Sequence, residues 1–490
     1  MPGARPWRRG SYNRAVQDPA QVSDLLARAQ QHHAQGQIAE AAECLRRYVA
    51  LVPDAAPQWH SLGVLCDALG DGDGALRAYS EAVRHDPQFV DAQLNLGVTL
   101  AELGRADEAL LALERATALA PGDAEILQNY ALALLDAGKT DAALEAVSRA
   151  AASGLAPGRA AGLAATAYAR AGRQADAERE YRRALDLEPG LAAAAVGLGI
   201  VLQESGRIED AIAGYRAFLA RQPADPGVNF ALCLALLAQG SPREAWPHYA
   251  GRPSARARNP RFAPPRDHRG LARQAVLVEH EQGIGDELFF LRFVPLLRAI
   301  AQPARIVYVP SPRLQPVLGN APQIDELRPQ APIYWSGPRL LAGDLPALCA
   351  EAAGEPQYPE AFRLKPDPAK RAHWQALLEA KGPGPYLAVN WEAGFGADSR
   401  QDVLRGGHRL HKRIEPELFG RALAGWHGTL VCVQRQPRAP DSAAFQAACA
   451  QQVLDAAAAH EEIGDLLALL SLVDEVAGVS STGMHLRAAA

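Results

Sequence analysis

The sequence predicts an α-helical solenoid followed by an α/β region with parallel sheets. Two observations predict this fold class: a 34-residue period in the first half of the chain, and an alternation of short apolar strands with helices after residue 275. Hydrophobic residues make up 48% of the 490 residues and charged residues 21%, as in an ordinary folded protein. The net charge of −5 argues against a dedicated nucleic-acid binder, which usually has a basic excess.

The 34-residue period covers residues 22–223. Prolines recur at Pro53, Pro87, Pro121, Pro189 and Pro223, and Leu155 stands at the position that lacks one. A glycine that ends the first helix of each unit recurs at Gly36, Gly70, Gly104, Gly138, Gly172 and Gly206. A small residue follows five positions later, at Ala41, Ala75, Ala109, Ala143, Ala177 and Ala211. An apolar or aromatic residue follows four positions after that, at Leu45, Tyr79, Leu113, Val147, Tyr181 and Tyr215.

This pattern resembles the tetratricopeptide repeat. Six repeats occupy residues 22–223, and a shorter seventh runs from Pro226 to Tyr249. The small residues let two antiparallel helices approach closely, the aromatic side chain fills the space beside them, and proline ends the second helix. We therefore expect one solenoid over residues 22–250, which binds a protein or peptide on its concave face.

Asn95 and Asn129 occupy the same position in two consecutive repeats, on the face that is expected to be concave. An asparagine amide can donate to and accept from a peptide backbone. The pair resembles the asparagine ladder of O-linked N-acetylglucosamine transferases, which implies acceptor binding. Only two such positions are present, and the alternative is that both are polar surface residues.

The ends and the joint of the chain carry weaker signals. Residues 1–21 are basic and lack the apolar core of a secretion signal, and no apolar run is long enough to span a membrane. The six cysteines form no CxxC pair, which favours reduced thiols and a cytoplasmic protein. Residues 251–274 hold seven arginines, one aspartate and four prolines. An anion-binding or nucleic-acid patch is one interpretation, and we favour the other, an extended connector.

The α/β region reads as two runs of alternating strands and helices. The first run, 275–384, contains strands at AVLVEH (275–280) and RIVYVP (305–310), a weaker strand at 324–328, one amphipathic helix at 288–300 and a helix starting near Arg313. The second run, 385–490, contains strands at YLAVNW, TLVCVQ, VLDAA and EVAGVS, with helices between them. The sequence KGPGP separates the runs. Two facing Rossmann-like lobes are therefore expected, with a ligand between them at the carboxyl ends of the strands.

The first candidate loop is EQGIGD at 281–286, between a strand and a helix. Its glycines, Gly283 and Gly285, allow a ligand to approach the backbone at a helix N-terminus. The longer sequence HEQGIGDELFFLRFVPLLR resembles the opening of glycosyltransferases that are fused to tetratricopeptide repeats and related to bacterial heptosyltransferases. The resemblance implies that Asp286 is the general base for an acceptor hydroxyl. The alternative is a helix N-cap aspartate without a catalytic role.

The second candidate loop lies between YLAVNW and the helix at PELF. Heptosyltransferases carry a lysine just before this Pro-Glu pair, where it holds the diphosphate of the sugar nucleotide, and Lys412 matches it, with Arg413 beside it. A cation there stabilises the leaving group without a metal ion. The alternative is a solvated basic loop. Asn390 and Glu392 end the preceding strand, and we expect them to touch sugar or acceptor.

The third candidate loop, SSTGMH at 480–485, resembles the phosphate-binding (D/N)TGxxHL loop of the same superfamily. The resemblance implies that Ser481, Thr482 and Gly483 contact phosphate and that His485 borders the site. This sequence departs from the pattern, because Ser481 replaces Asp or Asn and one residue is missing before the histidine. An ordinary strand-to-helix turn is the alternative.

Together these features predict a two-lobed (GT-B) glycosyltransferase that uses a nucleotide-sugar as donor, with no cofactor and no metal ion. The resemblance stops in the middle of the second lobe, so we expect that lobe to be truncated. The alternative function is a non-catalytic repeat scaffold with a degenerate glycosyltransferase domain.

Overall fold

The computed structural model describes residues 19–253, 267–319, 321, 323–330, 333–350, 359–393, 412–479 and 482–490. The chain divides into two compact units, and the boundary lies within the repeats, between Gly214 and Tyr215. The first unit is helical. The second contains the last repeat and two parallel sheets.

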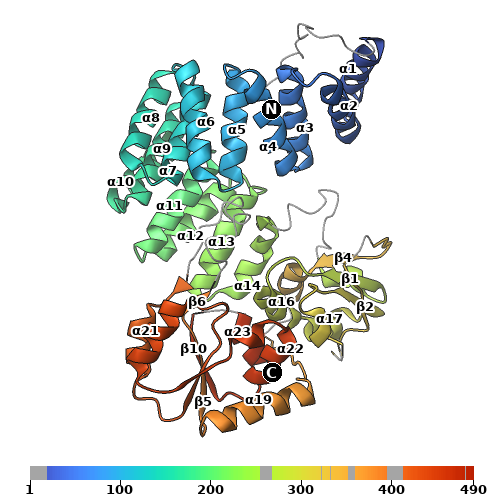
Figure 1. The fold of residues 1–490 in the computed structure, drawn as a ribbon, viewed down its shortest axis with the longest axis vertical. Coiled ribbons are helices and arrows are strands. Elements are labelled where there is room, and N and C mark those ends of the chain that lie inside the picture. The colour runs from blue at the N-terminus through green and yellow to red at the C-terminus, as the bar shows by residue number, and fades with distance from the viewer. Residues whose placement is uncertain are drawn as a thin grey trace. The chain divides into compact units, whose positions relative to one another are not determined.

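The first unit is a row of helix pairs joined by short turns (Figure 1). The first helices of the repeats are α1 (Pro19–Ala34), α3 (Ala56–Leu69), α5 (Val90–Glu102), α7 (Ala124–Asp136), α9 (Pro157–Arg170) and α11 (Ala192–Glu204). The second helices are α2 (Ile38–Leu51), α4 (Gly72–His85), α6 (Ala106–Leu119), α8 (Thr140–Ala152), α10 (Gln174–Leu187) and α12 (Ile208–Leu219), the last of which crosses the boundary. From α2 to α10, each second helix contacts the first helix of its own repeat and that of the next. This is the predicted solenoid.

The turns and the core of the repeats have the predicted residues in the predicted roles. The six turn glycines have φ between 71° and 75°, a left-handed conformation that strains any other residue. The six recurring alanines are at most 1% exposed. A side chain added at Gly63 or Gly197 would run into the ring of Tyr79 or Tyr181, so the aromatic residue fills the space that the glycine leaves.

The last repeat belongs to the second unit and packs on the first sheet region. It consists of α13 (Pro226–Gln239), α14 (Pro242–Ala245) and the 3-10 helix η1 (Trp246–Gly251). The Trp246 ring lies 6.1 Å from that of Phe289 and 6.2 Å from that of Phe293, and the Tyr249 ring lies 5.8 Å from that of Phe290. These aromatic contacts join the repeat to the α/β region.

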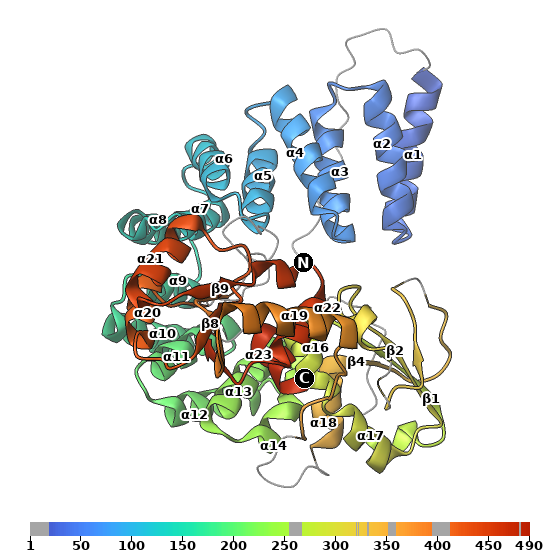
Figure 2. The ribbon, with the colours of Figure 1, turned by 60° about the horizontal axis from the view of Figure 1, so that its bottom comes forward.

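The first sheet has the strand order β3-β2-β1-β4, and all its strands are parallel. The strands are β1 (Ala275–Glu279), β2 (Arg305–Val309), β3 (Glu326–Leu327) and β4 (Arg339–Leu341). The helices are α16 (Ile284–Leu291), α17 (Val294–Ala301), α18 (Leu345–Cys349) and the 3-10 helices η2 (His268–Leu271), η3 (Gln315–Val317) and η4 (Ala342–Asp344). Figure 2 shows α17 and α18 in the same part of the molecule as β1, β2 and β4, and the two helices contact each other.

The second sheet has the order β10-β5-β8-β9, again parallel. Its strands are β5 (Tyr386–Asn390), β8 (Thr429–Cys432), β9 (Val453–Asp455) and β10 (Glu475–Gly478). The helices are α19 (Pro368–Lys381), α20 (Pro416–Leu423), α21 (Ala439–Cys449), α22 (Ile463–Leu470), α23 (Thr482–Ala489) and the 3-10 helix η6 (Ala457–His460). A short antiparallel ribbon pairs β6 (Glu392–Ala393) with β7 (Lys412–Arg413).

The two sheets share one topology. In each, the chain lays down three neighbouring strands in order and then adds a last strand on the other side of the first. The order reverses between β1 and β4 in the first sheet and between β5 and β10 in the second. Such a reversal opens a crevice at the carboxyl ends of the two strands, where ligands bind in open α/β sheets. One hydrophobic core contains side chains of both sheets, among them Val276, Tyr308, Ala388 and Val431.

The structure corrects several details of the predicted elements. The single helix expected at 288–300 is two helices, α16 and α17, which break before Pro295 because proline cannot donate the helical hydrogen bond. The helix expected near Arg313 is only the single turn η3. Helix α19 and strand β4 were not predicted. Helix α19 buries only Trp374 and Leu378, which gives it a weak apolar period.

None of the helices in the described part of the chain combines the length and the apolar character that crossing a bilayer requires.

Candidate functional site

The glycine turn after β1 starts helix α16. Gly283 is the N-cap residue, and Asp286 is exposed at the third position of the helix. A Cβ atom at Gly283 would lie 3.6 Å from Asp286 Oδ2, so this carboxylate lies over the helix N-terminus. Burial is the main cause that raises the pKa of the nearby Tyr249 hydroxyl, and the charge of Asp286 adds to it. Asp286 is therefore close to the end of the last repeat.

A buried ion network holds the glycine turn. Arg252 donates from Nε to Glu281 Oε2 at 2.9 Å and from Nη2 to Glu281 Oε1 at 2.8 Å and Asp344 Oδ1 at 2.7 Å. The Arg252 and Glu281 side chains are each 1% exposed. The Gly343 backbone N–H also donates to Glu281 Oε1 at 2.7 Å, and Gln282 Nε2 donates to the Tyr249 hydroxyl at 2.9 Å. This network lies between the carboxyl ends of β1 and β4, where the strand order reverses.

Burial acts on the charges of this network in opposite directions. It tends to lower the pKa of Arg252, but the Glu281 and Asp344 carboxylates outweigh it, and the pKa is raised. For Asp344, burial dominates over the Arg252 charge and raises the pKa. Sequence reasoning assigned Arg252 to a connector and missed the network, because its partners lie 29 and 92 residues further along the chain. Residues 254–266 of that connector lie outside the described part.

The helix that follows the third loop packs against the helix that follows the glycine turn. Helix α23 contacts α16, and a Cβ atom at Gly285 would lie 3.0 Å from His485 Cδ2. The structure thus brings Gly285 and His485 together, although 200 residues separate them. Ser481 lies outside the described residues. Thr482 and Gly483 are described only as the start of α23.

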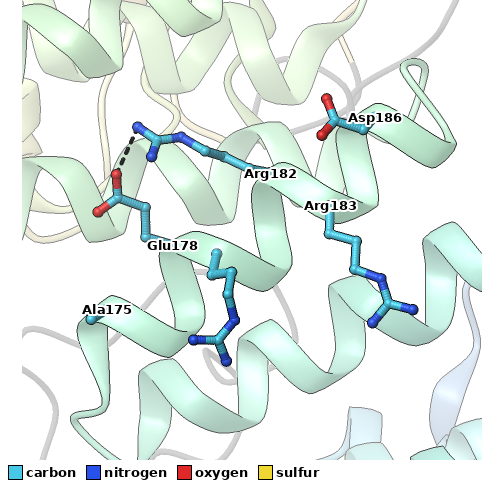
Figure 3. Close-up of a pocket in the computed structure, with 6 residues that line it drawn as sticks. Ala175, Glu178, Arg182, Arg183 and Asp186 are labelled. Carbon is cyan, nitrogen blue, oxygen red and sulfur yellow. Dashed lines mark ion pairs between the residues drawn. The ribbon is translucent and has the colours of Figure 1, made fainter.

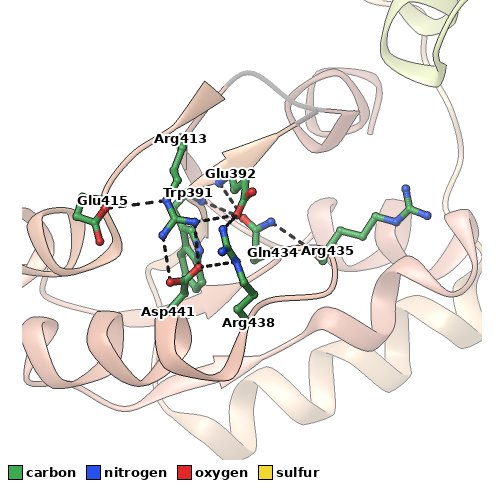
Figure 4. Close-up of polar contacts among 8 residues, drawn as sticks. All are labelled: Trp391, Glu392, Arg413, Glu415, Gln434, Arg435, Arg438 and Asp441. Atoms are coloured by element: carbon green, nitrogen blue, oxygen red, sulfur yellow. Dashed lines mark hydrogen bonds and ion pairs between the residues drawn. The ribbon is translucent and has the colours of Figure 1, made fainter. Parts of the chain in front are cut away.

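Arg413 is held by carboxylates beside the second loop (Figure 4). Its Nη1 and Nη2 each donate to Asp441 at 3.1 Å, and Nη1 also lies 3.3 Å from Glu392 Oε2. The hydrogen bond with Asp441 is the leading cause that raises the pKa of Arg413. Lys412 is described only as backbone, paired with Ala393 in the ribbon, and residues 394–411 lie outside the described part.

Asn390 and Glu392 help to arrange the strand ends of the second sheet. Asn390 is 4% exposed and donates from Nδ2 to the carbonyl of Val479 at 3.1 Å. Gly478 has φ +143° and lies so close to Asn390 that a side chain there would collide with it. The backbone N–H of Glu392 donates to Gln434 Oε1 at 2.9 Å. Asn390 therefore holds β5 to the segment that leads into the third loop.

The two asparagines of the repeats have separate contacts. Asn95 Nδ2 lies 2.9 Å from His60 Nε2, and Asn129 Nδ2 donates to the carbonyl of Glu125 at 2.9 Å. Burial lowers the pKa of His60, against the opposing charge of Asp91. Contact with an acceptor stays a prediction for both asparagines.

The first unit also carries a hollow on α10, of about 510 Å³ and open to solvent (Figure 3). Its lining residues are Ala175, Glu178, Arg179, Arg182, Arg183 and Asp186. Ion pairs occupy the charges, such as Arg182 with Glu178 at 2.7 Å. Across the described residues, histidine, cysteine and carboxylate side chains do not gather in threes as a metal site requires.

Comparison with known proteins assigns the helical part. Profiles of the family "Tetratricopeptide repeat" match residues 25–47, 60–124, 131–192 and 196–252. The helical part consists of tetratricopeptide repeats. Because these matches end at residue 252, they do not extend to the sheets.

The relatives that were found resemble the repeats. Protein FlbA of Caulobacter vibrioides is 30% identical over 242 residues, which is 44% of this chain and 40% of that protein. The chain thus spans less than half the length of this relative. A tetratricopeptide repeat protein from Parabacteroides merdae has 17% identity and a TM-score of 0.44, and covers 47% of this chain and 91% of its own. A thermophilic tetratricopeptide repeat protein from Thermus thermophilus has 25% identity and a TM-score of 0.34. The match covers 37% of this chain and 100% of that protein's chain. Both TM-scores lie below 0.5, so the assignment rests on the profiles and on the repeat pattern.

Proposed function

We propose that the second unit is a metal-independent glycosyltransferase of the GT-B type, which moves a sugar from a nucleotide-sugar to a hydroxyl of a protein or peptide. The observation that carries the proposal is the matched topology of the two sheets. The glycine turn follows the first strand of one sheet, and the third loop follows the last strand of the other, so both adjoin an order reversal. The contact between Gly285 and His485 joins these two places.

The proposed roles follow the chemistry of the side chains. Asp286 accepts the proton of the acceptor hydroxyl while that oxygen bonds to the anomeric carbon and the bond to the diphosphate breaks. Lys412, Thr482 and Gly483 stabilise the charge of the leaving diphosphate, and His485 borders the site. Asn390 and Glu392 shape the strand ends next to the sugar. Arg413 can contribute to diphosphate binding only by exchanging its carboxylate partners for phosphate.

A second candidate is a scaffold without catalysis. The tetratricopeptide repeats are a scaffold for protein interactions, and the matched profiles cover only them. The pairing of Arg413 with Asp441 favours this candidate, since it occupies a cation that the enzyme was expected to use. Both candidate functions include a cytoplasmic location and the binding of a peptide to the concave face of the repeats.

Calorimetry on the full chain with UDP, GDP, CDP and ADP tests the enzyme against the scaffold. We expect one nucleotide to bind, and Lys412→Ala to weaken it by one to two decades, the range for a charge-assisted hydrogen bond. If no nucleotide binds at millimolar concentration while an extended peptide binds the repeats, the result would favour the scaffold.

The base is tested separately by turnover. With the matching nucleotide-sugar, Asp286→Asn should keep binding but lower transfer at least about 100-fold. The matched control is Glu417→Gln, which removes an exposed carboxylate paired with Arg421 on α20. If Asp286→Asn and the control transfer sugar equally well, Asp286 is not the base.

A further inference from the structure

Two arginines occupy equivalent places in the two sheets. Arg313 follows β2, the second strand of the first sheet, and Arg435 follows β8, the second strand of the other. Both are exposed at the carboxyl edge of their sheet. This is the edge at which parallel sheets bind ligands.

His460, at the end of η6, connects the two loops. Its Nε2 lies 2.8 Å from the carbonyl oxygen of Val433, so this ring nitrogen carries a proton and donates it to a residue two positions before Arg435. The carbonyl of His460 in turn lies 3.5 Å from Arg313 Nη2. The segment after β2, which carries Arg313, has a second anchor, because the backbone N–H of Ser311 donates to the buried carboxylate of Glu287 at 3.0 Å. Both arginines therefore lie on anchored segments.

The two guanidinium groups repel each other. Burial and then the charge of Arg435 lower the pKa of Arg313, and both arginines lower the pKa of His460 beyond the effect of burial. Within the described part of the chain, neither arginine has a carboxylate within 4.0 Å. Arg438 shows the contrast three residues later, since it pairs with Glu392 at 3.5 Å and Asp441 at 3.3 Å. Figure 4 shows the Arg435 side chain extending away from that carboxylate cluster.

We propose that Arg313 and Arg435 form a phosphoryl-binding site between the two sheets. Two guanidinium groups without a carboxylate partner keep their N–H donors available, and a phosphoryl group offers several acceptor oxygens for two such planar groups. The inference goes beyond the proposed function, because it requires a phosphorylated ligand but no sugar transfer. It also places phosphoryl binding in the segments that follow β2 and β8, apart from the third candidate loop at 480–485.

Titration of the full chain with pyrophosphate tests the site. We expect Arg313→Gln and Arg435→Gln each to weaken binding about tenfold or more, and added salt to weaken it further. The matched control is Arg438→Gln, which removes an equal charge from the same segment and should leave pyrophosphate affinity unchanged. Equal binding by wild type and the two site variants, equal weakening by the control, or no pyrophosphate binding at millimolar concentration would each overturn the proposal.

Charge reversal gives a second readout that does not need a ligand. Arg313→Glu should pair with Arg435, raise the urea midpoint and abolish pyrophosphate binding in the same protein. A lowered or unchanged midpoint with retained binding would show that the two guanidinium groups do not act together.

The outcomes also separate this site from the proposed enzyme. If no nucleoside diphosphate binds but pyrophosphate binding depends on Arg313 and Arg435, the site exists and the proposed function is wrong. If a nucleotide binds through Lys412 while Arg313→Gln and Arg435→Gln change neither ligand, the enzyme survives and the phosphoryl site does not.

Discussion

The two units use charged side chains in different ways. In the repeats, many of the pairs are local and at least partly exposed: Arg84 with Glu81, Arg105 with Glu108 and Arg173 with Asp176 are each three residues apart in the chain. In the second unit, Arg252 is buried and joins carboxylates from two distant segments. An exposed pair contributes little because water screens it, whereas a buried charge that loses its partner is strongly destabilising. The comparison teaches that a count of ion pairs does not predict where the stability lies.

Removal of Arg252 should give the largest effect. Arg252→Ala leaves Glu281 and Asp344 buried without their cation, and we expect the second unit to lose about 3–5 kcal/mol of unfolding free energy. Urea unfolding measures it. Arg105→Ala is the matched control in the repeats and should cost no more than about 1 kcal/mol. Similar losses in the two variants would contradict the contrast between the units.

In the repeats, close packing of the helices should contribute more to the unfolding free energy than the exposed ion pairs do. A Cβ atom at Gly97 would lie 2.5 Å from Leu113 Cγ, so Gly97→Ala should cost about 1–3 kcal/mol through overpacking. Gly214 also lies inside a helix but has open space around it, and Gly214→Ala should stabilise by up to about 1 kcal/mol. Thermal unfolding of both variants should give shifts of opposite sign. Shifts of the same sign would mean that the helices move apart to accept the methyl group.

Helix caps should contribute an intermediate amount. Asp123 caps α7 by accepting from the N–H groups of Glu125 and Ile126, and Asp123→Ala should cost about 1 kcal/mol. Lys139 is the N-cap residue of α8 but its side chain makes no cap hydrogen bond, so Lys139→Ala serves as the control and should change little. Chemical denaturation distinguishes the two, and an equal cost would show that the cap bond is not the cause.

The smallest expected effect depends on pH. Because burial lowers the pKa of His60, the unfolded chain takes up a proton near pH 6.5 while the folded repeats do not. Stability should therefore fall as the pH falls below about 6.5, since the unfolded state binds more protons there. His60→Gln should reduce this slope when urea midpoints are measured between about pH 7 and 5. His248 and His460, whose pKa values burial also lowers, should keep part of the slope in the second unit. An unchanged slope would contradict the assignment to His60.

The repeats could be predicted almost completely from the sequence, because each contact recurs at a fixed separation. Gly104 and Ala109, for example, stand at two positions of the repeat whose residues have the same roles in every unit, so one repeat explains the others. Most strands of the sheets were also predicted, since β1, β2, β5 and β8 each contain a buried apolar run of at least three residues. The short strand β4 and helix α19 lack such a signal.

The candidate site was predicted only in part. The contact of Gly285 with His485 agrees with loops that follow strands at two order reversals, and the sequence motifs indicated both loops. The partners of Arg413 and Arg252 could not be predicted. Asp441, Glu281 and Asp344 lie on elements whose neighbours depend on the folded topology, and a lone carboxylate carries no pattern that identifies its cation.

The Arg252 network also limits how the chain can change its length. From α1 to α11 each helix contacts the next helix along the chain, so an array of this kind can gain or lose units of 34 residues there while the neighbouring units keep the same kind of interface. The last repeat is different, because Arg252, which directly follows η1, supplies the cation that two buried carboxylates beside the first sheet require. It is a constant part of the second unit, and variation in repeat number among proteins with this organisation should occur on its N-terminal side.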